Sequence, residues 1–172
     1  MKRRGQVWVE TIIYTLIGLA VIGLVLSAAL PKINEKKDAI AIEQSIGALR
    51  TIDAKIYQTQ SAVGNRRVVD LDIKEGYLTI DMEDDKITWT LDSSFAYSEI
   101  GFPISLGRLE VMTLEGNPFT VELKLDYEVD IKFGNVTSGT KRLDATPIPY
   151  RFTIENVGVK DDGDIIVDLT AS

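Results

Sequence analysis

The sequence contains no cysteine and no histidine, and its 172 residues include only five prolines. Without cysteine, the chain cannot form disulfides, thiolate metal sites or a thiol nucleophile. Without histidine, it lacks the side chain most often used as a general base near neutral pH. These two absences exclude zinc sites of the usual kind and most common forms of nucleophilic catalysis.

Basic residues are also scarce, and their distribution along the chain is uneven. Three of them, Lys2, Arg3 and Arg4, precede a long apolar run. From Pro31 onward the chain carries 16 basic and 25 acidic residues, a net charge of −9. An acidic surface of this kind disfavours nucleic acid as a partner.

The apolar run extends from Thr11 to Pro31 and contains 21 residues without a formal charge. As a helix it would be about 31 Å long, close to the roughly 30 Å of bilayer hydrocarbon. We therefore predict a transmembrane segment over about residues 7–31. The preceding basic residues predict that the start of the chain stays cytoplasmic and that the remainder faces outward. Glu10 lies just inside this segment, where an acid is expensive and suggests a function.

The motif Arg3-Arg4-Gly5-Gln6, followed by an apolar segment with a lone glutamate, resembles the leader of archaeal type IV pilins. The resemblance implies that a membrane-bound prepilin peptidase removes residues 1–5 by cleaving after Gly5. Gln6 would then begin the mature chain, and Glu10 would be its fifth residue. In that family this glutamate is thought to dock one subunit on the next, so Gln6 and Glu10 are the expected assembly residues.

The resemblance also implies a location and a set of partners. The precursor would lie in the cell membrane, in contact with lipid, and membrane assembly machinery would polymerise it into an extracellular surface filament of identical subunits. Such filaments serve in adhesion and surface attachment. The expected protein is structural, with no enzymatic activity, cofactor or metal.

Two other interpretations of the start of the chain remain open. A secretory signal peptide could be cleaved after Ala29, although its apolar core would be longer than usual and would carry a charge. Alternatively, an uncleaved signal anchor could hold a monomeric extracellular binding domain. The identity of the first residue in the native protein separates the three interpretations.

The rest of the sequence predicts an α+β fold, in which a long helix over residues 6–63 packs on a head over residues 64–172. Beyond Pro31, isoleucines and leucines recur mostly at helical spacing, which predicts an amphipathic stripe. The stripe contains Ile33, Ile42, Ile46, Leu49, Ile52 and Ile56. After Gly64, apolar and polar residues alternate, which predicts an antiparallel, immunoglobulin-like sandwich of seven or eight strands. The alternating run from Phe119 to Phe133 is too long for one flat strand, so we expect it to bend or pass between two sheets.

Several polar features of the head invite a functional interpretation. Acidic clusters surround Asp81–Asp85, Asp70–Asp72 and Asp161–Asp164. Calcium could bind the last, but a plain turn is the simpler interpretation of aspartates beside a glycine. No pair of carboxylates is singled out for glycosidase chemistry. The triplet starting at Asn135 has the form of an N-glycosylation acceptor. The phase of Trp89 predicts that it lies in the core.

Overall fold

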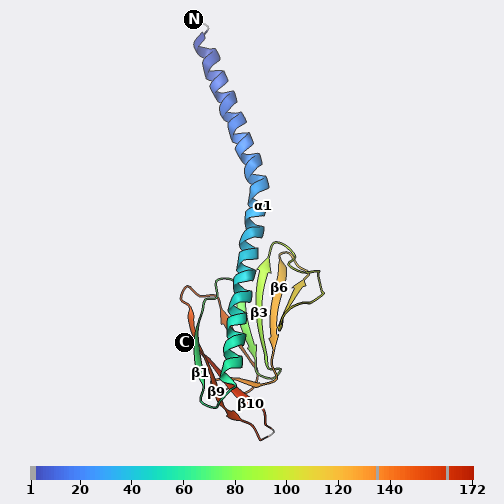
Figure 1. Cartoon of the computed structure of the whole chain (residues 1–172). Helices are drawn as coiled ribbons and strands as arrows, with labels where there is room; N and C mark the ends of the chain where they lie inside the picture. Colours follow the sequence, from blue (N-terminus) through green and yellow to red (C-terminus); the bar gives the residue numbers. More distant parts are fainter. Residues whose placement is uncertain (1–2, 135, 162) are drawn as a thin grey trace. The chain divides into compact units, whose positions relative to one another are not determined.

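The computed structural model describes residues 3–134, 136–161 and 163–172, with side chains from Trp8 onward. The long helix α1 spans Arg3–Thr59 and is followed by ten strands within the described residues (Figure 1). The strands are β1 (Arg66–Leu71), β2 (Tyr77–Asp81), β3 (Lys86–Ser93), β4 (Ile104–Leu106), β5 (Leu109–Leu114), β6 (Phe119–Asp126), β7 (Asp130–Phe133), β8 (Thr140–Asp144), β9 (Tyr150–Val159) and β10 (Ile165–Ala171). The chain divides into two compact units, one ending at Lys37 and the other spanning Asp38–Ser172.

The first unit is a single stretch of α1, and its helix continues through Pro31. Proline has no backbone N–H, so Pro31 cannot donate to the carbonyl four residues earlier. A proline inside a helix is therefore expected to kink the helix or break it locally. The structure excludes a break, because the residues on both sides of Pro31 remain helical.

The part of α1 in the second unit buries one face in the hydrophobic core. The buried apolar residues, each at most 6% exposed, are Ile42, Ile46, Leu49, Ile52 and Ile56. They form one core cluster with apolar side chains from both sheets, and Figure 1 shows this part of the helix beside the strands. The predicted stripe is confirmed at these five positions. It is wrong at Ile33, which belongs to the first unit and is 49% exposed.

The strands form two sheets. The larger has the order β4-β5-β6-β3-β2-β8, and all its neighbouring strands are antiparallel. The smaller has the order β1-β9-β10-β7, in which β10 and β7 run parallel. The α+β class with a long N-terminal helix is therefore confirmed. The expectation of seven or eight purely antiparallel strands is wrong, because the described residues contain ten strands and one parallel pair.

The long alternating run from Phe119 to Phe133 passes between the two sheets, as its length predicted. Its first part is β6 in the larger sheet, and its last part is β7 in the smaller one. Asp85, in the turn between β2 and β3, secures this crossing. Its carboxylate accepts a hydrogen bond from the N–H of Ile131 at 2.7 Å, and its carbonyl accepts one from the N–H of Tyr127 at 3.0 Å.

A side chain from β9 secures the end of α1. The last carbonyls of a helix have no intrahelical donor and need other partners. Asn156, only 2% exposed, donates from Nδ2 to the carbonyl of Thr59 at 3.2 Å. The backbone carbonyl of Asn156 also accepts from the N–H of Gly64 at 2.8 Å. This residue therefore holds both the helix end and the turn that leads to β1.

Candidate assembly surface on the apolar helix segment

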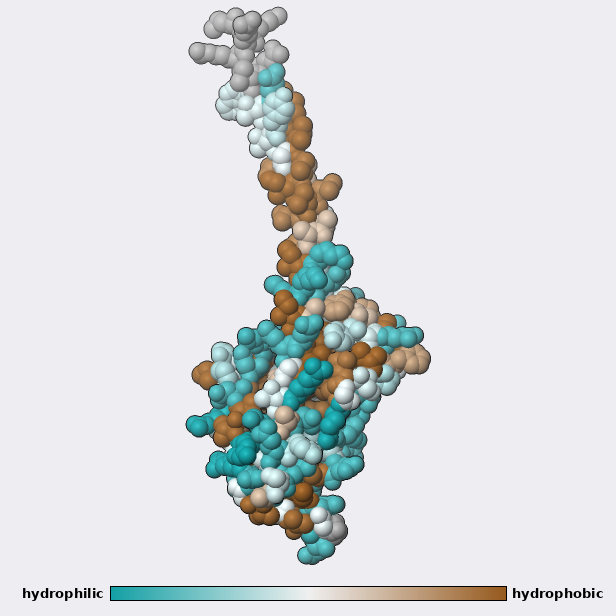
Figure 2. Space-filling model, viewed as in Figure 1, coloured by the Kyte–Doolittle hydropathy of each residue, from teal (hydrophilic) through white to brown (hydrophobic). Residues whose placement is uncertain are grey.

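The first unit contains an apolar surface that the described residues leave uncovered. We call residues 8–33 the apolar segment. Its fifteen large apolar side chains, from Trp8 to Ile33, are between 48% and 74% exposed. Figure 2 shows that brown, hydrophobic residues dominate much of this stretch of helix. A helix that is apolar all round requires an apolar environment, either lipid or other protein.

The polar side chains within this segment fit such an environment. Thr15 donates its hydroxyl to the carbonyl of Thr11, and Ser27 donates to the carbonyl of Leu24, both at 2.8 Å. These hydroxyls are satisfied within their own helix, as helical Ser and Thr often are. They therefore add little to the cost of placing the segment in lipid or in a helical bundle.

Glu10 is the one acidic residue among residues 8–33. Its side chain is exposed, and within the described residues it makes no ion pair or hydrogen bond. A carboxylate without a partner is costly in an apolar environment. Glu10 can therefore accept a cationic partner from outside its own chain.

Two glycines in the segment leave open space around the helix. Apart from the adjacent residues and the backbone of its own helical turn, a methyl group added at Gly18 or Gly23 would meet no atom within 4 Å. Glycine costs a helix interior roughly 0.5–1 kcal/mol relative to alanine. Packing within this chain does not require these residues, whereas a neighbouring helix could approach closely there.

The remaining predicted site residues have partial descriptions. The backbone of Arg3, Arg4, Gly5 and Gln6 belongs to α1, but their side chains lie outside the described residues. The backbone at the proposed cleavage site is thus helical, and the structure describes no side chain there. Asn135, the glycosylation candidate, lies outside the described residues as well.

The acidic cluster around Asp81 is built as a turn. Asp81 accepts hydrogen bonds from the backbone N–H groups of Glu83 and Asp84 at 3.0 and 3.3 Å. Asp84 forms an ion pair with Lys86 at 2.8 Å, which lowers its pKa. Asp85 has a φ of 52°, and its pKa is raised by burial, an effect that the N–H of Ile131 opposes.

The other two acidic clusters also have structural explanations, an ion pair in one and a backbone turn in the other. Asp72 pairs with Lys74 at 3.4 Å. The last cluster lies in a turn that the N–H of Lys160 closes by donating to the carbonyl of Asp164 at 2.8 Å; Asp162 lies outside the described residues. Nowhere in the described part of the chain do three or more acidic side chains gather to suit a metal ion.

Trp89 is 2% exposed, and its indole N–H donates to the carbonyl of Glu75 at 3.1 Å, so its predicted core position is confirmed. Two features of the structure were not predicted from the sequence. One is the contact of Asn156 with the end of α1. The other is the grouping of outward residues of the larger sheet around Tyr77 and Thr90, which strand pairing brings together.

By length and composition, one helix within the described residues could cross a membrane. Comparison of the chain with models of protein families, with curated proteins and with solved structures finds no match. The function of this protein is therefore inferred from its own residues.

Proposed function

We propose that this protein is a structural subunit of an archaeal type IV pilus-like surface filament. The precursor inserts in the membrane through its apolar segment, loses residues 1–5 by cleavage after Gly5, and polymerises through its N-terminal helix. The assembled filament serves in adhesion or surface attachment. Its partners are identical subunits, the prepilin peptidase and the membrane assembly machinery.

The exposed apolar segment is the observation from which this proposal starts. Burying a large apolar side chain contributes about 1.5–3 kcal/mol. The fifteen side chains are roughly half exposed, so covering them would contribute roughly 10–20 kcal/mol. Water is therefore a poor environment for this surface. Lipid before assembly and neighbouring helices afterwards both satisfy it, and the transfer between them need not expose it to water.

Glu10 supplies the register in this mechanism. Cleavage after Gly5 gives Gln6 a free amine, which is largely protonated at neutral pH. In a bundle of these helices, the amine of one subunit pairs with Glu10 of the next. The pair is strong in a low-dielectric core, and removing one partner leaves a costly unpaired charge. Apolar contacts supply most of the cohesion, while this pair determines where each subunit stops.

The head is proposed to be a variant of the immunoglobulin-like sandwich that faces outward on the filament, with glycosylation at Asn135. Its two sheets, which share one core, support this description. The parallel pairing of β7 with β10 distinguishes it from the fully antiparallel sandwich that the sequence pattern favours.

The second candidate function is a signal-anchored, monomeric extracellular binding domain. The exposed apolar segment suits that function equally well. Glu10, the open space at Gly18 and Gly23, and the Arg3–Gln6 motif favour the filament, because a monomeric anchor needs none of them.

Substitution of Glu10 in the native source tests the proposal. Glu10→Ala should leave the protein in the membrane fraction and abolish the filaments seen by electron microscopy. Glu10→Gln, which keeps the shape and removes the charge, should have the same effect. Glu35→Ala is the matched control, because Glu35 lies just beyond the apolar segment in an exposed pair with Lys32, and it should leave filaments normal. Abundant normal filaments in either Glu10 variant would contradict the proposal.

A further inference from the structure

A continuous groove lies over the outward face of the larger sheet and extends onto the loops at its edge. Three depressions on the second unit share lining residues and so join end to end. One, of about 310 Å³, lies over β2, β3, β5 and β6. The next, of about 500 Å³, shares Tyr77 and Thr90 with it and extends to Arg142. The third, of about 440 Å³, shares Lys74 and Ala145 with the second.

Strand register arranges the groove residues in two rows across five strands. The first row contains Glu110, Lys124, Thr88, Thr79 and Arg142, in the order β5-β6-β3-β2-β8. The second row contains Met112, Glu122, Thr90, Tyr77 and Asp144. With strands about 4.8 Å apart, the rows extend roughly 19 Å. Most of the residues in the middle are short threonines, and those on either side are longer, so the face forms a trough.

Most polar groups of the trough have no partner within the described residues. The hydroxyls of Thr79, Thr88 and Thr90 make no hydrogen bond there, and Glu122 and Lys124 make neither a hydrogen bond nor an ion pair. A ligand with many donors and acceptors could use all of them without breaking contacts of the fold.

Arg142 and Tyr77 form an ordered pair at one wall of this trough. The guanidinium of Arg142 lies over the Tyr77 ring, 3.5 Å from its centroid, and its Nε donates to Asp144 at 2.7 Å. Within the described residues, the terminal amino groups of Arg142 make no further hydrogen bond. Its orientation is therefore fixed by stacking, while its two outer nitrogens can donate to a ligand.

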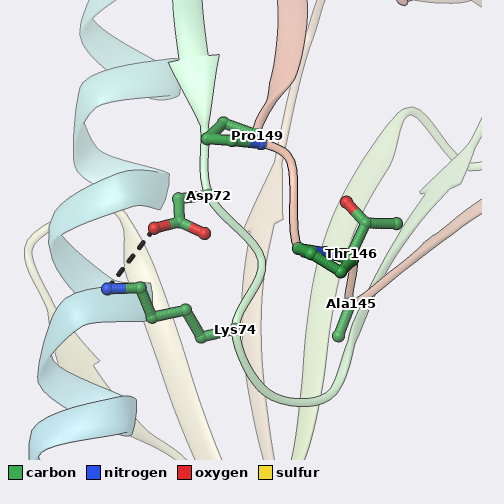
Figure 3. Close-up of a pocket in the computed structure, with 6 residues that line it drawn as sticks. Asp72, Lys74, Ala145, Thr146 and Pro149 are labelled. Atoms are coloured by element: carbon green, nitrogen blue, oxygen red, sulfur yellow. Dashed lines mark ion pairs between the residues drawn. The ribbon is translucent and has the colours of Figure 1, made fainter.

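The far end of the groove lies beside the loop between β8 and β9. Figure 3 shows Asp72 and Lys74, which form an ion pair, on one strand-connecting segment, with Thr146 and Pro149 on the other. Thr146 donates from its backbone N–H to the carbonyl of Ile73 at 3.2 Å, which ties the two segments together. This hydrogen bond therefore holds together the two segments that line this end of the groove.

The charges of the two rows select the class of ligand. The two rows carry three acidic residues, Glu110, Glu122 and Asp144, and two basic residues, Lys124 and Arg142, so their net charge is −1. Arg142 is paired with Asp144. The acidic character of the whole head repels polyanions. The lining mixes these polar groups with apolar side chains such as Met112, Pro147 and Pro149, so the ligand needs apolar C–H surface as well as hydroxyls. The remaining match is a neutral, hydroxyl-rich chain whose hydroxyls can donate to carboxylates and accept from threonine, lysine and arginine.

We propose that this groove binds a neutral oligosaccharide, laid along the threonines between Glu122 and Arg142. The proposal does not depend on filament formation, and it applies equally to an anchored monomer. Each depression falls within the roughly 300–1,000 Å³ of typical small-molecule sites.

The test uses the full chain in dodecylphosphocholine, a detergent without a sugar headgroup. The probes are printed hexasaccharides of glucose (α1-4, β1-3 and β1-4), mannose and N-acetylglucosamine, with sialylated and sulfated glycans for comparison. At least one neutral hexasaccharide should bind, and its affinity should be measured by calorimetry. Thr88→Arg, which fills the trough, and Arg142→Ala, which removes the ordered donor, should each weaken binding about tenfold or more, equivalent to about 1.4 kcal/mol.

Thr140→Arg is the matched control, because it adds the same charge to β8 outside the lining of the groove, and it should leave the affinity unchanged. Near-ultraviolet circular dichroism verifies that all three variants fold. Failure of every neutral hexasaccharide to bind, preference for the acidic glycans, or unchanged affinity in folded Thr88→Arg and Arg142→Ala would each overturn the proposal.

Discussion

Replacing Asn156 by alanine should destabilise the second unit by about 2–4 kcal/mol. The side chain donates to the carbonyl of Thr59 and accepts from the N–H of Gly158 at 3.1 Å, in a site where Asn156 is only 2% exposed. The alanine variant leaves both groups without these partners. Leaving the carbonyl of the fully buried Thr59 without this partner costs about 1–3 kcal/mol. Losing the part-buried hydrogen bond from Gly158 adds about 1 kcal/mol, which gives the stated range.

The assay is equilibrium unfolding in urea, followed by the fluorescence of the buried Trp89. A Trp8→Phe background removes the other tryptophan, which is 74% exposed. Asn65→Ala is the matched control, because its side chain donates to Ser61 in an exposed position, and it should cost less than about 0.5 kcal/mol. If Asn156→Ala costs no more than Asn65→Ala, then β9 does not secure the end of α1.

Three other substitutions test the remaining parts of the account. Leu49→Ala should cost about 2–5 kcal/mol in the same assay, since Leu49 is fully buried, whereas Ile40→Ala, at a 57% exposed position of the same helix, should be nearly neutral. Asp85→Ala should cost about 1.5–3.5 kcal/mol, because it loses the Ile131 hydrogen bond and places alanine at positive φ. Asp85→Asn should keep the hydrogen bond from Ile131, and asparagine tolerates the positive φ. Burial raises the pKa of Asp85 in the folded protein above the value of 3.8 that it has when unfolded. The free energy of unfolding should therefore fall as the pH rises from 3.8 to the raised pKa, because the folded state holds the proton more tightly. A urea series across this pH range should show that loss in the native chain and not in Asp85→Asn. Gly18→Ala should leave membrane insertion unchanged and reduce filament yield, and a normal yield would show that no helix approaches there.

Local periodicity was sufficient to predict the helix and the strands that bury one face. Ile42, Ile46 and Leu49 follow helical spacing, and the structure buries all three. Ile33 did not belong with them, and the reason is geometric. It precedes Ile42 by nine residues, about two and a half turns, so the two side chains point to opposite sides of the helix.

The edge strands carried too weak a signal to be predicted. β8 contains a single buried apolar residue, Leu143, and β4 has only three residues. Charged residues are common on edge strands because they discourage unwanted pairing. The parallel pairing of β7 with β10 could not be predicted either. Alternation of apolar and polar residues shows which face of a strand is buried, but not which other strand pairs with that strand.

The two candidate sites differ in how far the sequence alone could define them. The apolar segment is continuous in sequence, so its length, its lone glutamate and its lack of charge were all visible at once. The groove is assembled from five strands, and Glu110 and Arg142 share a row only because of non-local pairing. Polar residues on strands look alike until the register places them side by side.

The first residue of the protein isolated from its native source tests the central claim most directly. Mass spectrometry of the N-terminal peptide should identify a chain that begins at Gln6 in purified surface filaments. A chain that still begins at Met1, or that begins at Leu30, would contradict the filament proposal and would support an anchored domain or a secreted protein respectively.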